Sequence, residues 1–95
     1  MDMQNKIALV TAAASGAGRA GAFILAREGA AVAIVDQNEA GAKAVADEIR
    51  KRGGRALALA GDLREDAFSG NIVAATVKEF GRLDCLWNHL GTPGP

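Results

Sequence analysis

The sequence predicts an α/β fold, in which a doubly wound parallel sheet has helices on both faces. Short apolar runs recur along the chain, and such runs are typical of strands covered on both sides. Stretches with apolar residues at helical spacing separate these runs. Strands joined by helical crossovers pair in parallel, and right-handed crossovers place helices on both faces. The predicted order is β-α-β-α-β-α-β.

The first half of the chain supplies two strands and two helices. Residues 7–10 form a continuous apolar run, which predicts a buried strand. A helix is expected over about residues 18–28, and Gly29 is a plausible stop. The apolar residues that recur at helical spacing in it are Ala20, Phe23 and Ile24. Residues 30–36, AAVAIVD, predict the second buried strand. One helical stripe then consists of Ala42, Val45, Ala46 and Ile49, before RGG ends that helix.

The second half adds a strand, a helix and a further strand. Residues 55–62, RALALAGD, predict the third strand. A third helix is expected from apolar residues at Phe68, Ile72, Val73, Ala75, Val77 and Phe80. Residues 83–91, LDCLWNHLG, predict a buried fourth strand and its exit turn, and TPGP is an extended end. Cys85 lies in that strand and is expected to be an inert thiol.

Composition narrows the classes of function. The chain has 95 residues, 11 basic and 11 acidic, so charge gives no argument for nucleic acid or an anionic membrane as partner. No apolar stretch reaches 18 residues, and the first residues do not resemble a secretory signal. One cysteine cannot form an internal disulfide, and no spacing of metal ligands is present. The expected location is cytoplasmic.

Small and polar residues follow the predicted strands, and in an open parallel sheet ligands bind beyond the carboxyl ends of the strands. Gly16 and Gly18 remove side chains where a backbone could approach a diphosphate, and the following helix directs its N–H groups there. Asp36 lies 18 residues beyond Gly18, a spacing typical of a carboxylate that binds ribose hydroxyls. Two alternatives stay open. The glycines could serve close helix–strand packing, and Asp36 could cap a turn.

These residues carry a resemblance to a known family. The segment KIALVTAAASGAGRA, with VAIVD at 32–36, GDL at 61–63 and FGRLDCLWNHLG at 80–91, resembles the short-chain dehydrogenase/reductase family. The family's turn reads Thr-Gly-x-x-x-Gly-x-Gly. The four motifs stand in the same order and together span nearly the whole chain. The resemblance implies a partial sheet of the Rossmann type, with strand order 3-2-1-4 and the fourth strand as an edge.

The resemblance also implies roles for particular residues. Ser15 and Ala17 would contact the diphosphate, largely through backbone groups, and Gly16 and Gly18 would permit that approach. Asp36 would bind the adenosine ribose, and Asp62 and Leu63 would flank the adenine. The residues expected to line the path toward the nicotinamide are Asn88, Leu90 and Gly91. Since Ser15 and Gln37 are uncharged, the expected cofactor is NAD and not NADP.

Two positions depart from the family pattern. Ala12 replaces the first glycine of the turn, and His89 and Leu90 replace Asn-Ala in the last motif. A methyl group at position 12 is tolerable where φ is negative. We expect a negative φ there, because Ala12 directly follows an extended strand. His89 has no visible partner for catalysis, so we expect it to be packed or hydrogen-bonded.

The chemistry that the resemblance implies is hydride exchange with a small carbonyl or alcohol substrate, using a Tyr-x-x-x-Lys motif. The chain contains no tyrosine, so no catalytic residue is assigned within it. Residues 1–95 are expected to be a single dinucleotide-binding domain, the N-terminal part of a longer chain that forms a homo-oligomer. Two further hypotheses stay open. One is a non-catalytic nucleotide-binding module, and the other is a methyltransferase-like domain that binds adenosylmethionine, against which the long turn argues.

Overall fold

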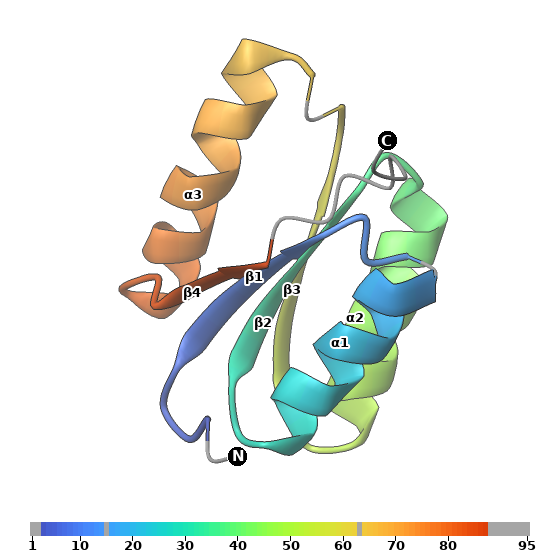
Figure 1. Cartoon of the computed structure of the whole chain (residues 1–95), viewed down its shortest axis with the longest axis vertical. Helices are drawn as coiled ribbons and strands as arrows, with labels where there is room; N and C mark the ends of the chain where they lie inside the picture. Colours follow the sequence, from blue (N-terminus) through green and yellow to red (C-terminus); the bar gives the residue numbers. More distant parts are fainter. Residues whose placement is uncertain (1–2, 15, 63, 88–95) are drawn as a thin grey trace, which may run out of the picture.

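The computed structural model describes residues 3–14, 16–62 and 64–87. Strands and helices alternate along the chain as the sequence predicts (Figure 1). The strands are β1 (Ile7–Thr11), β2 (Ala31–Asp36), β3 (Arg55–Ala60) and β4 (Cys85–Trp87). The helices are α1 (Gly16–Arg27), α2 (Glu39–Lys51) and α3 (Asp66–Phe80).

The four strands form one parallel sheet in the order β3-β2-β1-β4, which confirms the predicted order. Helices α1 and α2 cover one face and α3 covers the other (Figure 1). Strand β1 is wholly buried because it lies between two strands and between two helical layers. The predicted α/β fold with a doubly wound parallel sheet is therefore confirmed.

Side chains alternate between two cores, one on each face of the sheet. Val10, Val32 and Ile34 face α1 and α2, whereas Leu9 and Val35 face α3. The predicted stripe of α2 is buried as a whole, so the period of 3.6 residues identified its inner face correctly.

The inner face of α1 differs from the expected stripe. Its buried residues are Gly18, Gly21, Ala22 and Leu25. Ala20 and Ile24 are exposed. The reason is close packing, because a Cβ atom at Gly21 would overlap the indole ring of Trp87. Small residues face the sheet here, and larger ones are left outside.

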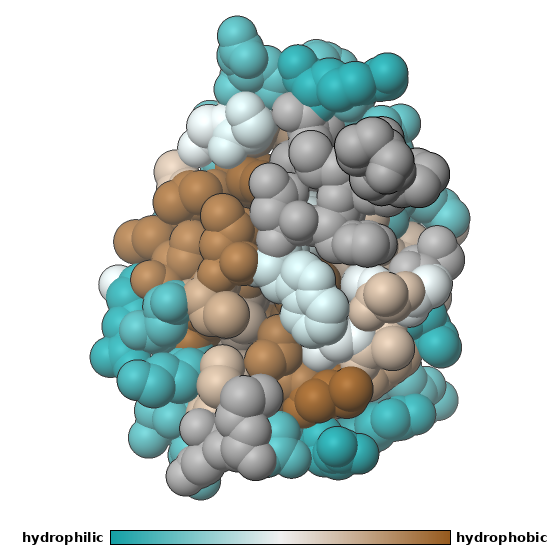
Figure 2. All heavy atoms as spheres, in the orientation of Figure 1, coloured by the Kyte–Doolittle hydropathy of each residue, from teal (hydrophilic) through white to brown (hydrophobic). Residues whose placement is uncertain are grey.

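The outer layer near α3 and β4 also differs from expectation. Of the six apolar residues predicted for the third helix only Ile72 is buried, and Val73 and Val77 are 41% and 39% exposed. Strand β4 is an edge strand within the described residues, where Leu86 is 55% exposed. Figure 2 shows hydrophobic surface on the side of the molecule formed by α3 and β4. The expected burial of Cys85 is therefore wrong, since an edge strand leaves it half-buried.

Candidate functional site

The carboxyl ends of β1, β2 and β3 form one rim of the sheet, and the predicted site residues follow these ends. Hydrogen bonds join the segments of this rim. The amide of Ala13 donates to the carbonyl oxygen of Val35 at 3.1 Å, and the amide of Gly61 donates to that of Asp36 at 3.1 Å. The turn after each strand is thus fixed to the end of its neighbour.

Ala12 occupies the left-handed region of backbone conformation, with φ at 52°. The expectation of a negative φ is wrong. The chain must leave β1 so that the amide of Ala13 reaches Val35 while the carbonyl of Ala12 meets the start of α1. The close approach is visible at Gly18, where a Cβ atom would overlap the carbonyl oxygen of Ala12 and lie 3.0 Å from that of Thr11. Alanine therefore carries a conformation that glycine adopts without steric cost.

The first turn of α1 faces open space at the rim. Gly16 has φ at 62°, and a Cβ atom placed there would meet nothing within 4 Å. The amides of Gly16, Ala17 and Gly18 belong to the first turn, where N–H groups have no acceptor within the helix. That turn contains no acidic residue. The arrangement suits a bound anion, since no carboxylate within that turn offsets the positive end of the helix dipole.

Asp36 ends β2 and connects two loops through its half-buried carboxylate. Its Oδ2 accepts from the amide of Ala14 at 3.0 Å, and its Oδ1 accepts from the amide of Asn38 at 2.9 Å. The bond from Asn38 is the turn cap that the sequence analysis kept as an alternative role for Asp36. The first bond reaches across 22 residues to the turn after β1. From the described residues each oxygen of Asp36 accepts one hydrogen bond, and a carboxylate oxygen can accept two, so each can also accept from a hydroxyl group.

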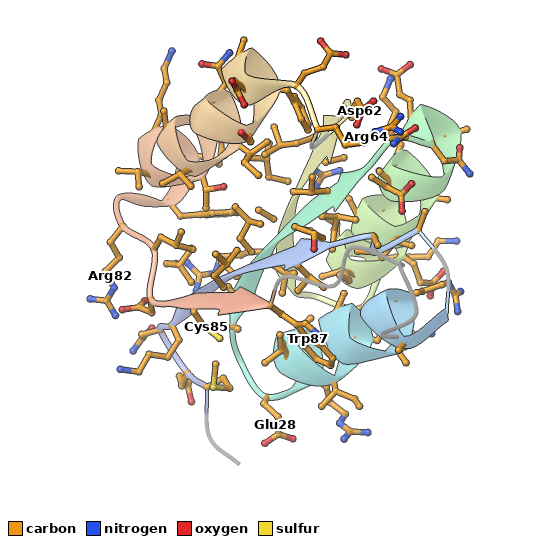
Figure 3. The ribbon with its side chains drawn as sticks, turned by 45° about the horizontal axis from the view of Figure 1, so that its top comes forward. Glu28, Asp62, Arg64, Arg82, Cys85 and Trp87 are labelled. Carbon is orange, nitrogen blue, oxygen red and sulfur yellow. The ribbon has the colours of Figure 1, made fainter. Side chains whose placement is uncertain are left out.

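Asp62 follows β3 and is held by Arg64, and Figure 3 shows the two side chains together at this rim. Nη2 of Arg64 donates to Oδ2 at 2.8 Å, and Nε donates to Oδ1 at 3.0 Å. The amide of Arg64 also donates to Oδ1, at 2.9 Å. The Arg64 side chain, followed by its backbone amide, lowers the pKa of the Asp62 carboxyl below its usual value.

The structure brings half of the predicted site residues to one rim. These are Gly16, Ala17, Gly18, Asp36 and Asp62. The others lie outside the described residues, and they are Ser15, Leu63, Asn88, Leu90 and Gly91. The sequence analysis did not identify Arg64, although its position two residues after Asp62 is a usable signal. It also missed the amide of Ala14, for which the sequence carries no signal.

The opposite end of the sheet contains a hydrogen-bonded cluster of a different kind. Oδ2 of Asp84 accepts from the amide of Ile7 and from Nε of Arg82, each at 2.9 Å. Nη2 of Arg82 also donates to the carbonyl oxygen of Asn5 at 2.8 Å. These bonds lower the pKa of Asp84, the backbone bond from Ile7 most of all. They attach the start of β4 to the start of β1.

A shallow groove of about 480 Å³ lies between the C-terminal parts of α1 and α2, away from the rim. Its lining includes Phe23, Ile24, Ile49 and Arg52. Over residues 3–14, 16–62 and 64–87, no group of three residues is arranged to hold a metal ion. No helix in the same ranges combines the length and apolar character that crossing a membrane requires.

Comparison with known proteins connects this geometry to one group of enzymes. The family model described as short chain dehydrogenase matches residues 6–95. The chain is 43% identical over 91 residues to an uncharacterized oxidoreductase of Thermotoga maritima, covering 96% of the chain and 36% of that protein. It is 45% identical over 93 residues to 2,5-dichloro-2,5-cyclohexadiene-1,4-diol dehydrogenase of Sphingobium indicum, covering 98% and 37%. The chain thus spans little more than a third of these relatives.

Solved structures give the same result. The apo form of glucose dehydrogenase from Caenorhabditis elegans superimposes with a TM-score of 0.87 at 30% identity, covering 94% of the chain and 39% of that protein. A 7α-hydroxysteroid dehydrogenase in complex with NADH and 7-oxo glycochenodeoxycholic acid also gives a TM-score of 0.87 at 30% identity, covering 90% and 33%.

Proposed function

Because the chain belongs to the short-chain dehydrogenase family, we propose that it is the cofactor-binding part of an NAD-dependent oxidoreductase. Its place is the N-terminal part of a longer polypeptide that exchanges hydride with a carbonyl or alcohol substrate. The observation that carries the choice of cofactor is the carboxylate of Asp36, which is held at the rim by two backbone amides.

The first turn of α1 is proposed to bind the pyrophosphate. Amides of Gly16, Ala17 and Gly18 would donate to its oxygens, together with Ser15, which lies outside the described residues. Two observations support this assignment. The space above Gly16 is open, and no acidic side chain in that turn repels an anion.

Asp36 is proposed to accept hydrogen bonds from the hydroxyls of the adenosine ribose. A carboxylate at this position favours NAD, because it would repel the 2′-phosphate of NADP unless a nearby cation offset its charge. No ion pair involves Asp36 in the part of the chain that the structure describes. The next residue, Gln37, is exposed and uncharged.

The contacts to the adenine and to the nicotinamide are proposed from the resemblance to the family. Asp62 and Leu63 would flank the adenine, and Asn88, Leu90 and Gly91 would lead toward the nicotinamide. When bound, the nicotinamide ring would accept or give the hydride. Relatives support a carbonyl or alcohol substrate, since one is named a diol dehydrogenase and another a hydroxysteroid dehydrogenase.

Calorimetric titration with NAD, NADP and adenosylmethionine tests this proposal. We expect NAD to bind more tightly than NADP and adenosylmethionine not to bind. Asp36→Asn removes the charge that favours NAD, and we expect about tenfold weaker NAD binding and a smaller NAD/NADP ratio. Asp47→Asn is the matched control, because that exposed carboxylate on α2 pairs with Arg50 and is remote from the rim. Tighter binding of NADP than of NAD by the unmodified chain would contradict the role of Asp36.

A second function is a nucleotide-binding module without catalysis. A Tyr-x-x-x-Lys segment further along the reading frame would support the enzyme, and NADH formation from alcohols by that longer polypeptide would decide between the two. Cofactor binding without turnover over a broad panel of alcohols would favour the module.

A further inference from the structure

The edge of the sheet at β3 is partly covered by one side chain of α2. Within the described residues β3 is an edge strand, because the strand order is β3-β2-β1-β4. Nε and Nη2 of Arg50 donate to the carbonyl oxygen of Ala56 at 3.1 Å and 2.7 Å. Nη1 of the same guanidinium donates to Oδ1 of Asp47 at 3.0 Å. Every nitrogen of the Arg50 guanidinium therefore has an acceptor, and the group is held against the strand.

The direction of the backbone along β3 decides which of its groups lie at the outer edge. The amide of Gly61 donates to the carbonyl oxygen of Asp36, so Gly61 directs its backbone groups toward β2. In a parallel sheet, successive residues direct their N–H and C=O groups alternately to the two sides of a strand. The residues of β3 whose backbone groups are directed away from β2 are therefore Ala56, Ala58 and Ala60.

The edge strand itself carries little protection against pairing with another strand. Edge strands are commonly protected by charged side chains, by proline or by a bulge. After Arg55, β3 contains only alanine and leucine, and its register with β2 is continuous. The protection comes from α2 instead. The two N–H groups of Arg50 use both acceptor positions of the Ala56 carbonyl, so an incoming amide finds no free lone pair on that oxygen.

The outer edge of β3 is complementary to itself. The outward residues are evenly spaced about Ala58, so β3 of a second copy in antiparallel orientation can place Ala58 opposite Ala58 and Ala56 opposite Ala60. Each outward N–H then meets a carbonyl of the other copy, and the side chains at these positions are all methyl groups. The carbonyl of Ala56 is an acceptor in both halves of this ladder, so the Arg50 guanidinium of each copy would have to leave before the strands could pair fully.

We propose that the outer edge of β3 is a strand-pairing surface for β3 of a second copy of this chain, and that Arg50 keeps this surface closed. The inference goes beyond the proposed function, since it does not depend on which cofactor binds at the rim. Because one guanidinium covers the edge in each copy, a single substitution of Arg50 removes both obstacles to the pairing.

Sedimentation equilibrium measures this pairing, with Leu86→Lys present in every protein so that the edge at β4 contributes as little as possible. Arg50→Met keeps an aliphatic stem and removes the donors, and we expect its dimer Kd to be at least about tenfold lower than that of the Leu86→Lys parent. Arg50→Lys keeps the charge but lacks the planar fork, and its Kd should lie between the two. If Arg50→Met does not fold, the comparison of Arg50→Lys with the parent decides.

Two further substitutions separate pairing at β3 from other association. Arg52→Met is the matched control, because it removes a nearby guanidinium that pairs with Glu48 and not with β3, and it should leave the parent's Kd unchanged. Ala58→Pro removes an outward N–H that the pairing needs and no bond to β2. Added to Arg50→Met, it should return the Kd to that of the parent. Ala60→Pro, at the exposed end of the strand, serves the same purpose if Ala58→Pro does not fold.

Amide hydrogen exchange supplies a readout that a loss of stability would not produce. In Arg50→Met the amide of Ala58 should exchange about tenfold more slowly at concentrations where the dimer forms than at high dilution, whereas in the parent its rate should not depend on concentration. A monomeric Arg50→Met at every concentration overturns the inference. Association that persists with proline at position 58 or 60, or that leaves the exchange of the Ala58 amide unchanged, overturns it as well, because the copies would then meet elsewhere.

Discussion

Replacing Ala12 by glycine is expected to stabilise the protein and to leave its fold unchanged. Ala12 has φ at 52°, and an L-residue in the left-handed region costs roughly 1–2 kcal/mol relative to its usual conformations. Glycine removes this cost but has more conformational freedom to lose on folding, which costs about 0.5–1 kcal/mol. The net increase in the free energy of unfolding is about 0.5–1 kcal/mol.

Urea denaturation followed by circular dichroism measures this difference, and for a domain of this size the melting temperature should rise by about 3–6 °C. Ala13→Gly is the matched control. Ala13 is fully buried and is not among the described residues with positive φ, so glycine there should lower the free energy of unfolding by about 1 kcal/mol. Equal or lower stability of Ala12→Gly would refute the assignment of strain to position 12.

Three other substitutions test the packing, the electrostatics and the edge of the sheet. Gly21→Ala should destabilise the protein by about 1–3 kcal/mol in urea titrations, because its methyl group overlaps the indole of Trp87. In a protein that also carries Trp87→Val, Gly21→Ala should cost less. An equal cost with and without the indole of Trp87 would contradict the contact. The hydrogen bonds that Asp84 accepts lower the pKa of its carboxyl from the ordinary value of 3.8, so their stabilisation is present above that value and is lost as pH falls through the lowered pKa. Asp84→Asn should therefore lose less stability than the unmodified protein on acidification below about pH 4, and an equal loss in both would argue against this role. The exposed edge strand at Leu86 should make the chain self-associate as its concentration rises. Leu86→Lys should reduce this self-association in sedimentation experiments, and an unmodified chain that stays monomeric at every concentration would refute the prediction.

The sequence pattern alone is sufficient for the order of strands and helices along the chain, and the family resemblance supplies the order of the strands within the sheet. Runs such as residues 31–35 are buried on both faces, and this requirement produces a continuous apolar signal that periodicity detects. The buried stripe of α2 is predicted equally well, because the other faces of that helix are charged. Local patterns of this kind are strong when each face of a strand or helix lies either wholly in the core or wholly in solvent.

The inner face of α1 could not be predicted from hydrophobicity. Gly18 and Gly21 face the sheet because the backbone and Trp87 approach closely, and apolar scales give glycine little weight. The positive φ of Ala12 has the same origin. It is imposed by hydrogen bonds between segments far apart in the chain, which local propensity does not record.

At the candidate site, the sequence predicts the carboxylates but not their partners. Asp36 and Asp62 follow strands and are recognisable by position. The amide that reaches Asp36 comes from Ala14, and no side chain marks it. Backbone donors of this kind become visible only when the loops are placed in space.

The position of β1 in the middle of the sheet has a consequence for the order of folding. Its pairing with β2 joins residues about two dozen positions apart, as does the pairing of β2 with β3. Its bonds to the start of β4 span 77 positions. Closing the longer loop costs about 1 kcal/mol more in chain entropy, and only three residues of β4 pair with β1. We therefore expect β4 to dock last and to exchange its amide hydrogens first, as the least cooperative strand of the described sheet.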